Sequence, residues 1–172
     1  MKTNILVIGS GISGLTYAIK VAGLNPQLNL VIISKNNLLE SNTKYAQGGI
    51  AVVSNFQKDS FDKHVQDTLT AGAGACDEAV VRFVVEEGHE RLNELIEWGA
   101  QFDTKSNSNG LHLTREGGHS EKRIVHHKDK TGLEIQKSQS KKIKTFSNIS
   151  LLENHTLRDL ITDHHTGTDY KR

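Results

Sequence analysis

Scarcity of several residue types limits what this chain can be. Its 172 residues include one cysteine, one proline, one tryptophan and 5% aromatic residues. The single thiol, Cys76, excludes an internal disulfide framework and is typical of a reducing compartment, so we expect a cytoplasmic protein. Twenty-one Lys and Arg residues against 20 Asp and Glu residues leave a net charge of +1, which gives no reason to expect a nucleic-acid partner. No run approaches the ~18 consecutive apolar residues of a membrane span, so no membrane association is expected.

The N-terminal part of the chain instead carries a strand, a helix and a second strand in close succession. Residues 5–8 and 30–33 are continuous apolar runs, as expected of strands that are buried on both faces of a parallel sheet. Between them, four apolar residues at helical spacing predict an amphipathic helix: Leu15, Ala18, Ile19 and Ala22. This pattern predicts an α/β fold that opens with a Rossmann-like βαβ unit.

A glycine-rich turn joins the first strand to the helix, and it reads Gly9-Ser10-Gly11-Ile12-Ser13-Gly14. Between a buried strand and a helix, this Gly-x-Gly-x-x-Gly spacing is typical of a dinucleotide-binding site. Gly9 permits the tight turn, Gly11 lets the backbone approach a pyrophosphate, and Gly14 lets helix and strand pack closely. The phosphates are expected at the positive N-terminal end of the helix.

The position that should hold the adenosine ribose is unusual. Sites of this type carry an acidic side chain about 20 residues after the turn, at the end of the second strand. This chain has Ser34 and Lys35 there. Lys35 suits the 2′-phosphate of NADP, and Ser34 with Lys35 equally suits the adenosine end of a flavin nucleotide. Both interpretations stay open at this point.

The remainder of the chain predicts a smaller α+β region. The expected elements are a short helix around residues 61–69, a longer helix from Asp77 that Gly88 interrupts and Gly99 ends, a polar helix from its N-cap Thr131 to Thr145, and paired strands at 149–152 and 157–162. Residues 104–110 are expected to form an exposed loop.

Three further blocks carry a resemblance to a known family. They read Thr43-Lys44-Tyr45-Ala46-Gln47-Gly48-Gly49-Ile50-Ala51, then His112-Leu113-Thr114-Arg115-Glu116-Gly117-Gly118-His119-Ser120, then Asp129-Lys130-Thr131-Gly132. With the glycine turn, they make the chain similar to the L-aspartate oxidases, within the flavoprotein superfamily that includes the flavin subunits of succinate dehydrogenase and fumarate reductase. The resemblance implies that residues 1–162 are the first part of an FAD-binding domain with the start of a capping region. Residues 163–172 would be a polar tail, and the chain would be truncated.

The resemblance also implies FAD as a non-covalent cofactor. The dehydrogenase branch attaches its FAD to a histidine, and the matching residue here is Asn42, which cannot form that bond. The implied cofactor contacts are Gly9, Ser10, Gly11, Ile12, Ser13, Gly14, Lys35, Asn42, Thr43, Lys44, Tyr45, Ala46, Gln47, Gly48, Gly49, Thr156 and Leu157. No metal is expected, because the adjacent histidine pairs at 126–127 and 164–165 make poor chelates.

The reaction implied by the resemblance is the oxidation of L-aspartate to iminoaspartate, the first step of NAD biosynthesis through quinolinate. Oxygen or fumarate would be the electron acceptor, with functional coupling to quinolinate synthase. Glu116 is implied to be the catalytic group that faces the substrate ammonium; alternatively, it is a surface carboxylate paired with Arg115 or Arg123. Two other functions stay open: a succinate dehydrogenase or fumarate reductase type of subunit, and a truncated FAD-binding fragment without activity.

Overall fold

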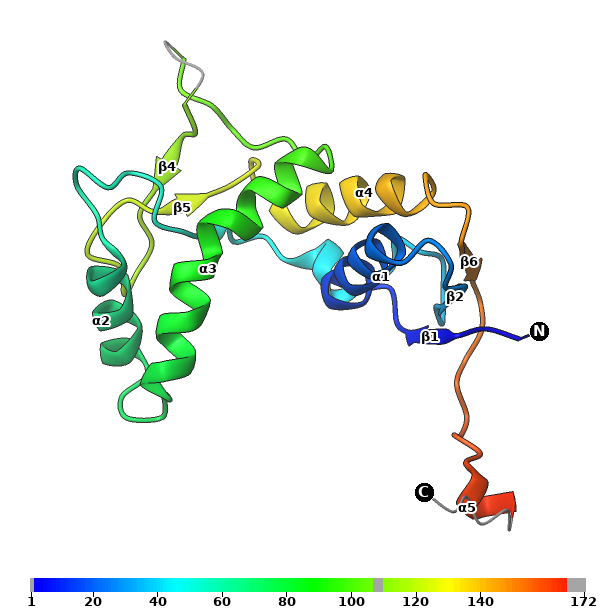
Figure 1. The fold of residues 1–172 in the computed structure, drawn as a ribbon. Helices are drawn as coiled ribbons and strands as arrows, with labels where there is room; N and C mark the ends of the chain where they lie inside the picture. The colour runs from blue at the N-terminus through cyan, green and yellow to red at the C-terminus, as the bar shows by residue number, and fades with distance from the viewer. Residues whose placement is uncertain (1, 107–109, 167–172) are drawn as a thin grey trace.

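A parallel three-stranded sheet and two helices form the first part of the molecule. The computed structural model describes residues 2–106 and 110–166. The elements of this part are β1 (Ile5–Ile8), α1 (Ile12–Leu24), β2 (Leu30–Ile33), α4 (Thr131–Ile143) and β6 (Ile149–Leu152). The strands lie in the order β1-β2-β6, and α1 packs against α4 beside them (Figure 1). The expected α/β fold with an N-terminal βαβ unit is therefore confirmed.

The core of this unit follows the predicted apolar stripe. All four stripe residues of α1 are buried, and they pack against Leu30 and Ile32 of β2. Burial of β1 on both faces was a wrong prediction: Val7 is buried, but Leu6 and Ile8 are 43% and 51% exposed. The reason is that β1 lies at the edge of the sheet and presents alternate side chains to opposite faces, only one of which meets the helices.

The second part of the molecule is a small antiparallel sheet with two helices. Its elements are β3 (Ile50–Ala51), α2 (Phe61–Ala71), α3 (Glu78–Glu97), β4 (Leu113–Thr114) and β5 (Ile124–Val125), with strand order β3-β5-β4. A 3₁₀-helix, η1 (Asn42–Tyr45), lies on the connection from the first part. In Figure 1, α3 extends from the antiparallel sheet towards α4, and Trp98 at its end packs against both hydrophobic cores.

Most of the predicted ends of the helices in the second part are confirmed. Asp77 caps α3 by accepting a hydrogen bond from the Val80 N–H (3.2 Å), and the helix ends before Gly99, whose φ is +96°. Gly88, however, does not interrupt α3, which runs unbroken to Glu97. A Cβ on Gly88 would lie 3.6 Å from Val52, an ordinary contact, so the packing around the helix does not require glycine here.

The start of α4 and the loop at 104–110 also differ from their predictions. Thr131 is the first residue of α4 and not its N-cap, which is Lys130; the Thr131 hydroxyl instead accepts from the His127 N–H (3.1 Å). Thr104 pairs with Leu111 in an isolated bridge, so the expected loop is the end of a small hairpin, with 107–109 outside the described residues.

The predicted pairing of 149–152 with 157–162 is also wrong. β6 pairs in parallel with β2, and residues 157–162 form no strand; Leu160 and Ile161 within them are 54% and 79% exposed. The expected polar tail begins with a single helical turn, α5 (Asp163–Thr166). β6 pairs with β2 instead of forming a local hairpin with residues 157–162, because all four residues of β2 are available to it as parallel partners. In the described part of the chain, no helix combines the length and apolarity needed to span a membrane.

Candidate functional site

The glycine turn has the close packing that its sequence predicts. Gly9 has a φ of +105°, and its N–H donates to the carbonyl oxygen of Ile33 (2.9 Å), which ties the turn to the end of β2. A Cβ placed on Gly14 would lie 2.5 Å from the Gly9 carbonyl oxygen and 3.2 Å from a methyl group of Val7. Only glycine at position 14 therefore lets α1 start this close to β1.

The N-terminus of α1 is open to an anion. Its N-cap is Gly11, no side chain of its own first turn caps it, and that turn holds no acidic residue. The Ile12 N–H donates to the hydroxyl of Thr43 (3.0 Å), which brings the segment 42–45 to this end of the helix. The remaining N–H groups and the positive end of the helix dipole suit a pyrophosphate, so the predicted residues of the turn fit FAD.

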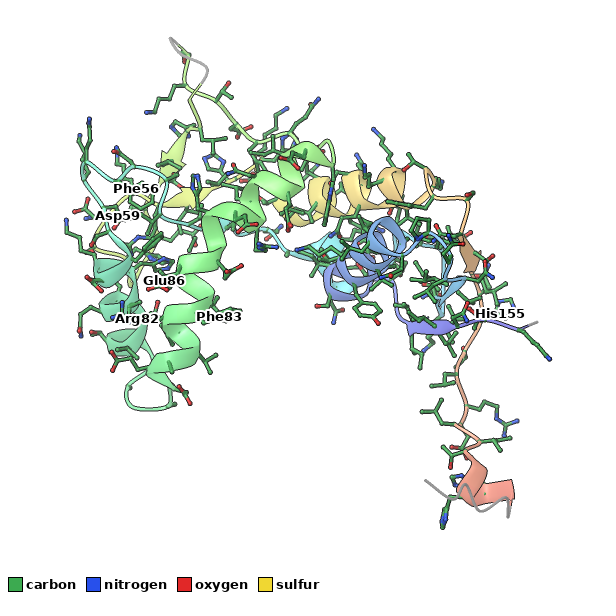
Figure 2. All side chains as sticks on the ribbon, viewed as in Figure 1. Phe56, Asp59, Arg82, Phe83, Glu86 and His155 are labelled. Atoms are coloured by element: carbon green, nitrogen blue, oxygen red, sulfur yellow. The ribbon has the colours of Figure 1, made fainter. Side chains whose placement is uncertain are left out.

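The predicted adenosine end lies at the carboxyl ends of β2 and β6. The Ser34 and Ser10 hydroxyls are 2.9 Å apart, and both residues are buried. The His155 N–H donates to the Ser34 carbonyl (2.9 Å), so the chain that leads to Thr156 passes beside the end of β2. Figure 2 shows His155 at this end of the molecule. Lys35 is exposed next to Ser34. The structure thus brings three of the predicted cofactor segments to one end of the sheet.

The segment 42–49 connects that end with the antiparallel sheet. The Gly132 N–H at the start of α4 donates to the Ala46 carbonyl (3.0 Å), and Gly49 lies against Ile124 and Val125 so closely that a Cβ would collide with both. Lys44 and Tyr45 both bind the carboxylate of Glu40, whose pKa is lowered by these hydrogen bonds, Lys44 contributing most. Their side chains are thus held by a neighbour, while residues 46–48 are exposed and Gly49 is half-buried.

Glu116 lies on the loop between β4 and β5, in the second part of the molecule. It is exposed, and in the described part of the chain its carboxylate has no ion pair. The His119 N–H donates to the Glu116 carbonyl (3.3 Å) and closes a turn. The alternative of a Glu116–Arg123 pair was wrong, because Arg123 is fully buried with other partners.

Arg123 and two aspartates form a buried ionic cluster that fixes this loop. The guanidinium donates to both carboxylate oxygens of Asp59 (2.7 and 2.8 Å) and to Asp67 on α2 (2.5 Å). Asp67 also accepts from the Ser120 N–H and hydroxyl, each at 2.8 Å. Burial alone would raise the pKa of Asp67, but the hydrogen bonds from Ser120 and Arg123 prevail and lower it to about 2.

Two histidines lie against the same guanidinium. Arg123 lies 3.2 Å from Nδ1 of His119, close enough for the guanidinium to donate a hydrogen bond to this ring nitrogen. The ring of His64 is 5.7 Å from that of His119. Burial, followed by the charge of Arg123, lowers the pKa of His64.

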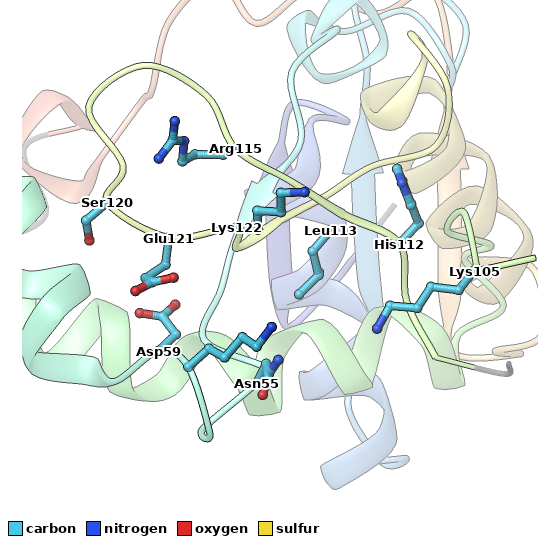
Figure 3. Close-up of a pocket in the computed structure, with 10 residues that line it drawn as sticks. Asn55, Asp59, Lys105, His112, Leu113, Arg115, Ser120, Glu121 and Lys122 are labelled. Atoms are coloured by element: carbon cyan, nitrogen blue, oxygen red, sulfur yellow. The ribbon is translucent and has the colours of Figure 1, made fainter. Parts of the chain in front are cut away.

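A hollow of about 620 Å³ lies beside the cluster (Figure 3). The cationic side chains that line it are Lys58, Lys105, Arg115 and Lys122. Its two carboxylates are already engaged, Asp59 by Arg123 and Glu121 by Lys63 (2.8 Å). The hollow therefore carries an excess of positive charge that attracts anions.

Sequence reasoning missed the two buried polar groups that organise the site, Arg123 and Gln136. Gln136 of α4 is fully buried and donates a hydrogen bond to Ser10 of the glycine turn. A signal was present for Gln136: with Gln139 it occupies the same helical stripe as the buried Ile135 and Ile143, where apolar residues are the rule. For Arg123 no local pattern predicts the ionic cluster, because its two carboxylate partners lie 56 and 64 positions away along the chain.

Comparisons with known proteins agree with this geometry. A family described as FAD binding domain matches residues 4–169. The L-aspartate oxidase of Vibrio cholerae is 45% identical over 172 residues, and the chloroplastic L-aspartate oxidase of Arabidopsis thaliana is 48% identical over 156 residues. The alignments cover 98% and 91% of this chain but 31% and 23% of those relatives. The chain thus spans less than a third of their length.

Two solved structures resemble the chain over most of its length. The quinol fumarate reductase FrdA of E. coli superposes with a TM-score of 0.84 at 28% identity, over 90% of this chain and 26% of that chain. Sdh1 of Mycobacterium smegmatis superposes with a TM-score of 0.79 at 27% identity, over 88% of this chain and 27% of that one.

Proposed function

Because the chain belongs to the FAD binding domain family, we propose that it is the cofactor-binding part of an L-aspartate oxidase, which converts L-aspartate to iminoaspartate. The observation that carries the proposal is the open N-terminus of α1 behind the packed glycine turn, in a chain that is 45% identical to an L-aspartate oxidase. The product is an intermediate on the route to NAD through quinolinate, in the cytoplasm, where quinolinate synthase would be the functional partner.

The chain's own residues would hold FAD at three places. The backbone N–H groups of residues 11–14 would bind the pyrophosphate, while Lys35 and the chain at 156–157 would contact the adenosine end. The backbone of 46–49 would lie beside the flavin, where Gly48 leaves its surroundings open. When bound, FAD supplies the redox chemistry by accepting a hydride equivalent from the substrate carbon. Asn42 leaves that cofactor without a covalent bond to the chain.

Glu116 would recognise the ammonium group of the substrate. Its carboxylate is exposed and without an ion pair in the described part of the chain, so no partner must be displaced before an ammonium binds. The buried cluster around Arg123 holds both the loop end at Ser120 and β5, which limits the movement of Glu116. A charge-assisted hydrogen bond of this kind contributes about 1.5–3 kcal/mol.

The second candidate function is a fumarate reductase or succinate dehydrogenase type of subunit. It is favoured by the superposition on FrdA of E. coli. Against it stand Asn42, which offers no histidine for covalent attachment, and Glu116, a carboxylate that suits a substrate with an ammonium group. Fumarate as electron acceptor, in place of oxygen, is compatible with both candidates.

The test begins with FAD titration of the 172-residue chain, followed by flavin fluorescence. We expect weak but saturable binding and no aspartate-dependent hydrogen peroxide from this chain alone. In a full-length L-aspartate oxidase that contains this segment, Glu116→Gln should raise KM for L-aspartate by about tenfold, because one charge-assisted hydrogen bond is lost. Glu121→Gln is the matched control, since this carboxylate of the same loop is paired with Lys63. A complete product that prefers succinate to aspartate would contradict the proposal.

A further inference from the structure

One side chain of α4 contacts three separate segments around the candidate cofactor site. The Gln136 amide nitrogen donates to the carbonyl oxygen of Ser10 (2.7 Å) and to that of Leu38 (2.8 Å). Its amide oxygen accepts from the Ser41 hydroxyl (2.9 Å). The side chain has no exposed surface, so water cannot replace these bonds.

The three segments are those to which different portions of FAD are assigned. Ser10 lies in the glycine turn of residues 9–14, which is called the phosphate turn below, and Leu38 follows the proposed adenosine contact at Lys35. Ser41 directly precedes η1, whose Thr43 accepts a hydrogen bond at the N-terminus of α1. In the described chain, Gln136 is the side chain that binds all three. Their relative positions therefore depend on an amide that lies 126 positions along the chain from Ser10.

The bond to Ser10 also determines which way a peptide group of the turn points. In a trans peptide, the C=O and the following N–H point in opposite directions because the group is planar. The Ser10 carbonyl points towards Gln136, so the Gly11 N–H points away from α4, at the N-cap of α1. A rotated Ser10–Gly11 peptide would present a carbonyl oxygen there, which repels phosphate.

We propose that Gln136 is a positioning residue for FAD, which sets the orientation of the phosphate turn and its distance from the segments 38–41 and 42–45. It does not touch the cofactor; it acts through the backbone of Ser10 and Leu38 and through Ser41. The inference rests on the proposed assignment of FAD to this turn. Nearby Gln139 has a purely internal role, since its amide donates to Thr16 on the second turn of α1 (2.8 Å).

The experiment compares Gln136→Met with Gln139→Met in the 172-residue chain. Both side chains are fully buried on α4, and methionine keeps their length while removing the hydrogen bonds. We expect Gln136→Met to raise the Kd for FAD by about tenfold or more, because two buried carbonyls lose their donor and the turn can rotate. Gln139→Met should change that Kd by less than about twofold, although both variants lower Tm.

Equal changes of Kd in the two variants, or no change in either, would overturn the proposal. If Gln136→Met does not fold, Ser41→Ala removes only the bond to its amide oxygen, and about a threefold rise in Kd is expected. Amide hydrogen exchange provides a readout without FAD. Exchange at residues 11–12 and 39–41 should rise in Gln136→Met and stay unchanged in Gln139→Met. A wild-type chain without FAD affinity would contradict the assignment of FAD to this chain, while the exchange data would still decide the role of Gln136.

Discussion

At the scale of single residues, Gly14 is the position where the smallest change should have a large effect. Gly14→Ala places a methyl group 2.5 Å from the Gly9 carbonyl oxygen, a backbone atom that cannot move without opening the turn. We expect a loss of about 2 kcal/mol in the free energy of unfolding, typical of an overpacked site. Urea denaturation measures it.

Gly23 provides the matched control on the same helix. A Cβ there would lie 3.8 Å from the Phe146 ring, an ordinary contact, so Gly23→Ala should leave stability unchanged or raise it by up to about 1 kcal/mol. Equal destabilisation by both alanines would contradict the close packing of the phosphate turn.

Asp67 should make the stability of the chain depend on pH in the acid range. The pKa of its carboxyl is about 2 in the folded chain against 3.8 without partners. A lowered pKa stabilises the fold at pH values above 3.8, and that contribution is lost as pH falls from about 4 to 2. Its size is on the order of 2 kcal/mol, at 1.36 kcal/mol per pKa unit.

Unfolding by urea at a series of pH values measures this contribution. The difference in stability between the wild type and Asp67→Asn should shrink steadily between pH 4 and pH 2. Asp62 on the same helix, with an 82% exposed side chain, serves as control for the substitution, and Asp62→Asn should change the free energy of unfolding by less than about 1 kcal/mol. A constant difference between the wild type and Asp67→Asn over this range would refute the assigned role.

At the scale of elements, Arg123 joins β5, α2 and the segment before α2. Lysine cannot reproduce a guanidinium that donates to two carboxylates at once, so Arg123→Lys should cost about 3 kcal/mol in the free energy of unfolding. The same substitution should also raise amide exchange at Ser120, because the Asp67 carboxylate that accepts its N–H loses a partner.

Arg82 is the control for this substitution. It pairs with Asp62 (2.8 Å) across α2 and α3, but its side chain is 41% exposed, so Arg82→Lys should leave stability almost unchanged. Figure 2 shows Arg82 and Glu86 on the same stretch of α3, separate from Asp59. Similar losses in Arg82→Lys and Arg123→Lys would mean that burial adds nothing to the Arg123 cluster.

At the scale of the whole molecule, local patterns predicted local structure. The unit β1-α1-β2 could be read from apolar spacing and glycine positions, because its strands and helix follow one another with short connections. The strand expected at 157–162 failed because β6 pairs with a strand more than a hundred residues earlier, and periodicity holds no information about such partners.

In the candidate site, too, residues that belong to a local pattern could be predicted and residues whose role depends on distant segments could not. The glycine turn was predicted from its motif, since backbone approach requires small residues at fixed spacing, whereas the role of the segment 42–49 was implied by the family resemblance. Gln136 and the Arg123 cluster escaped prediction because their roles are set by contacts between distant segments. An arginine has the same appearance in a sequence whether it is solvated or fully buried. Gln136 leaves only the weak signal of a polar residue on the buried stripe of α4, which does not identify its partners.

The long separation along the chain between Ser10 and Gln136 affects how the protein folds while it is being synthesised. A ribosome adds roughly 5–20 residues per second, so the glycine turn waits on the order of ten seconds for α4 and β6 to emerge. Most of the second part of the molecule is complete in that interval, and its own core can form first. The end of the sheet beside the glycine turn then assembles after most of the second part, and its β2 edge stays exposed to chaperones or to misplaced strands until synthesis has passed Leu152.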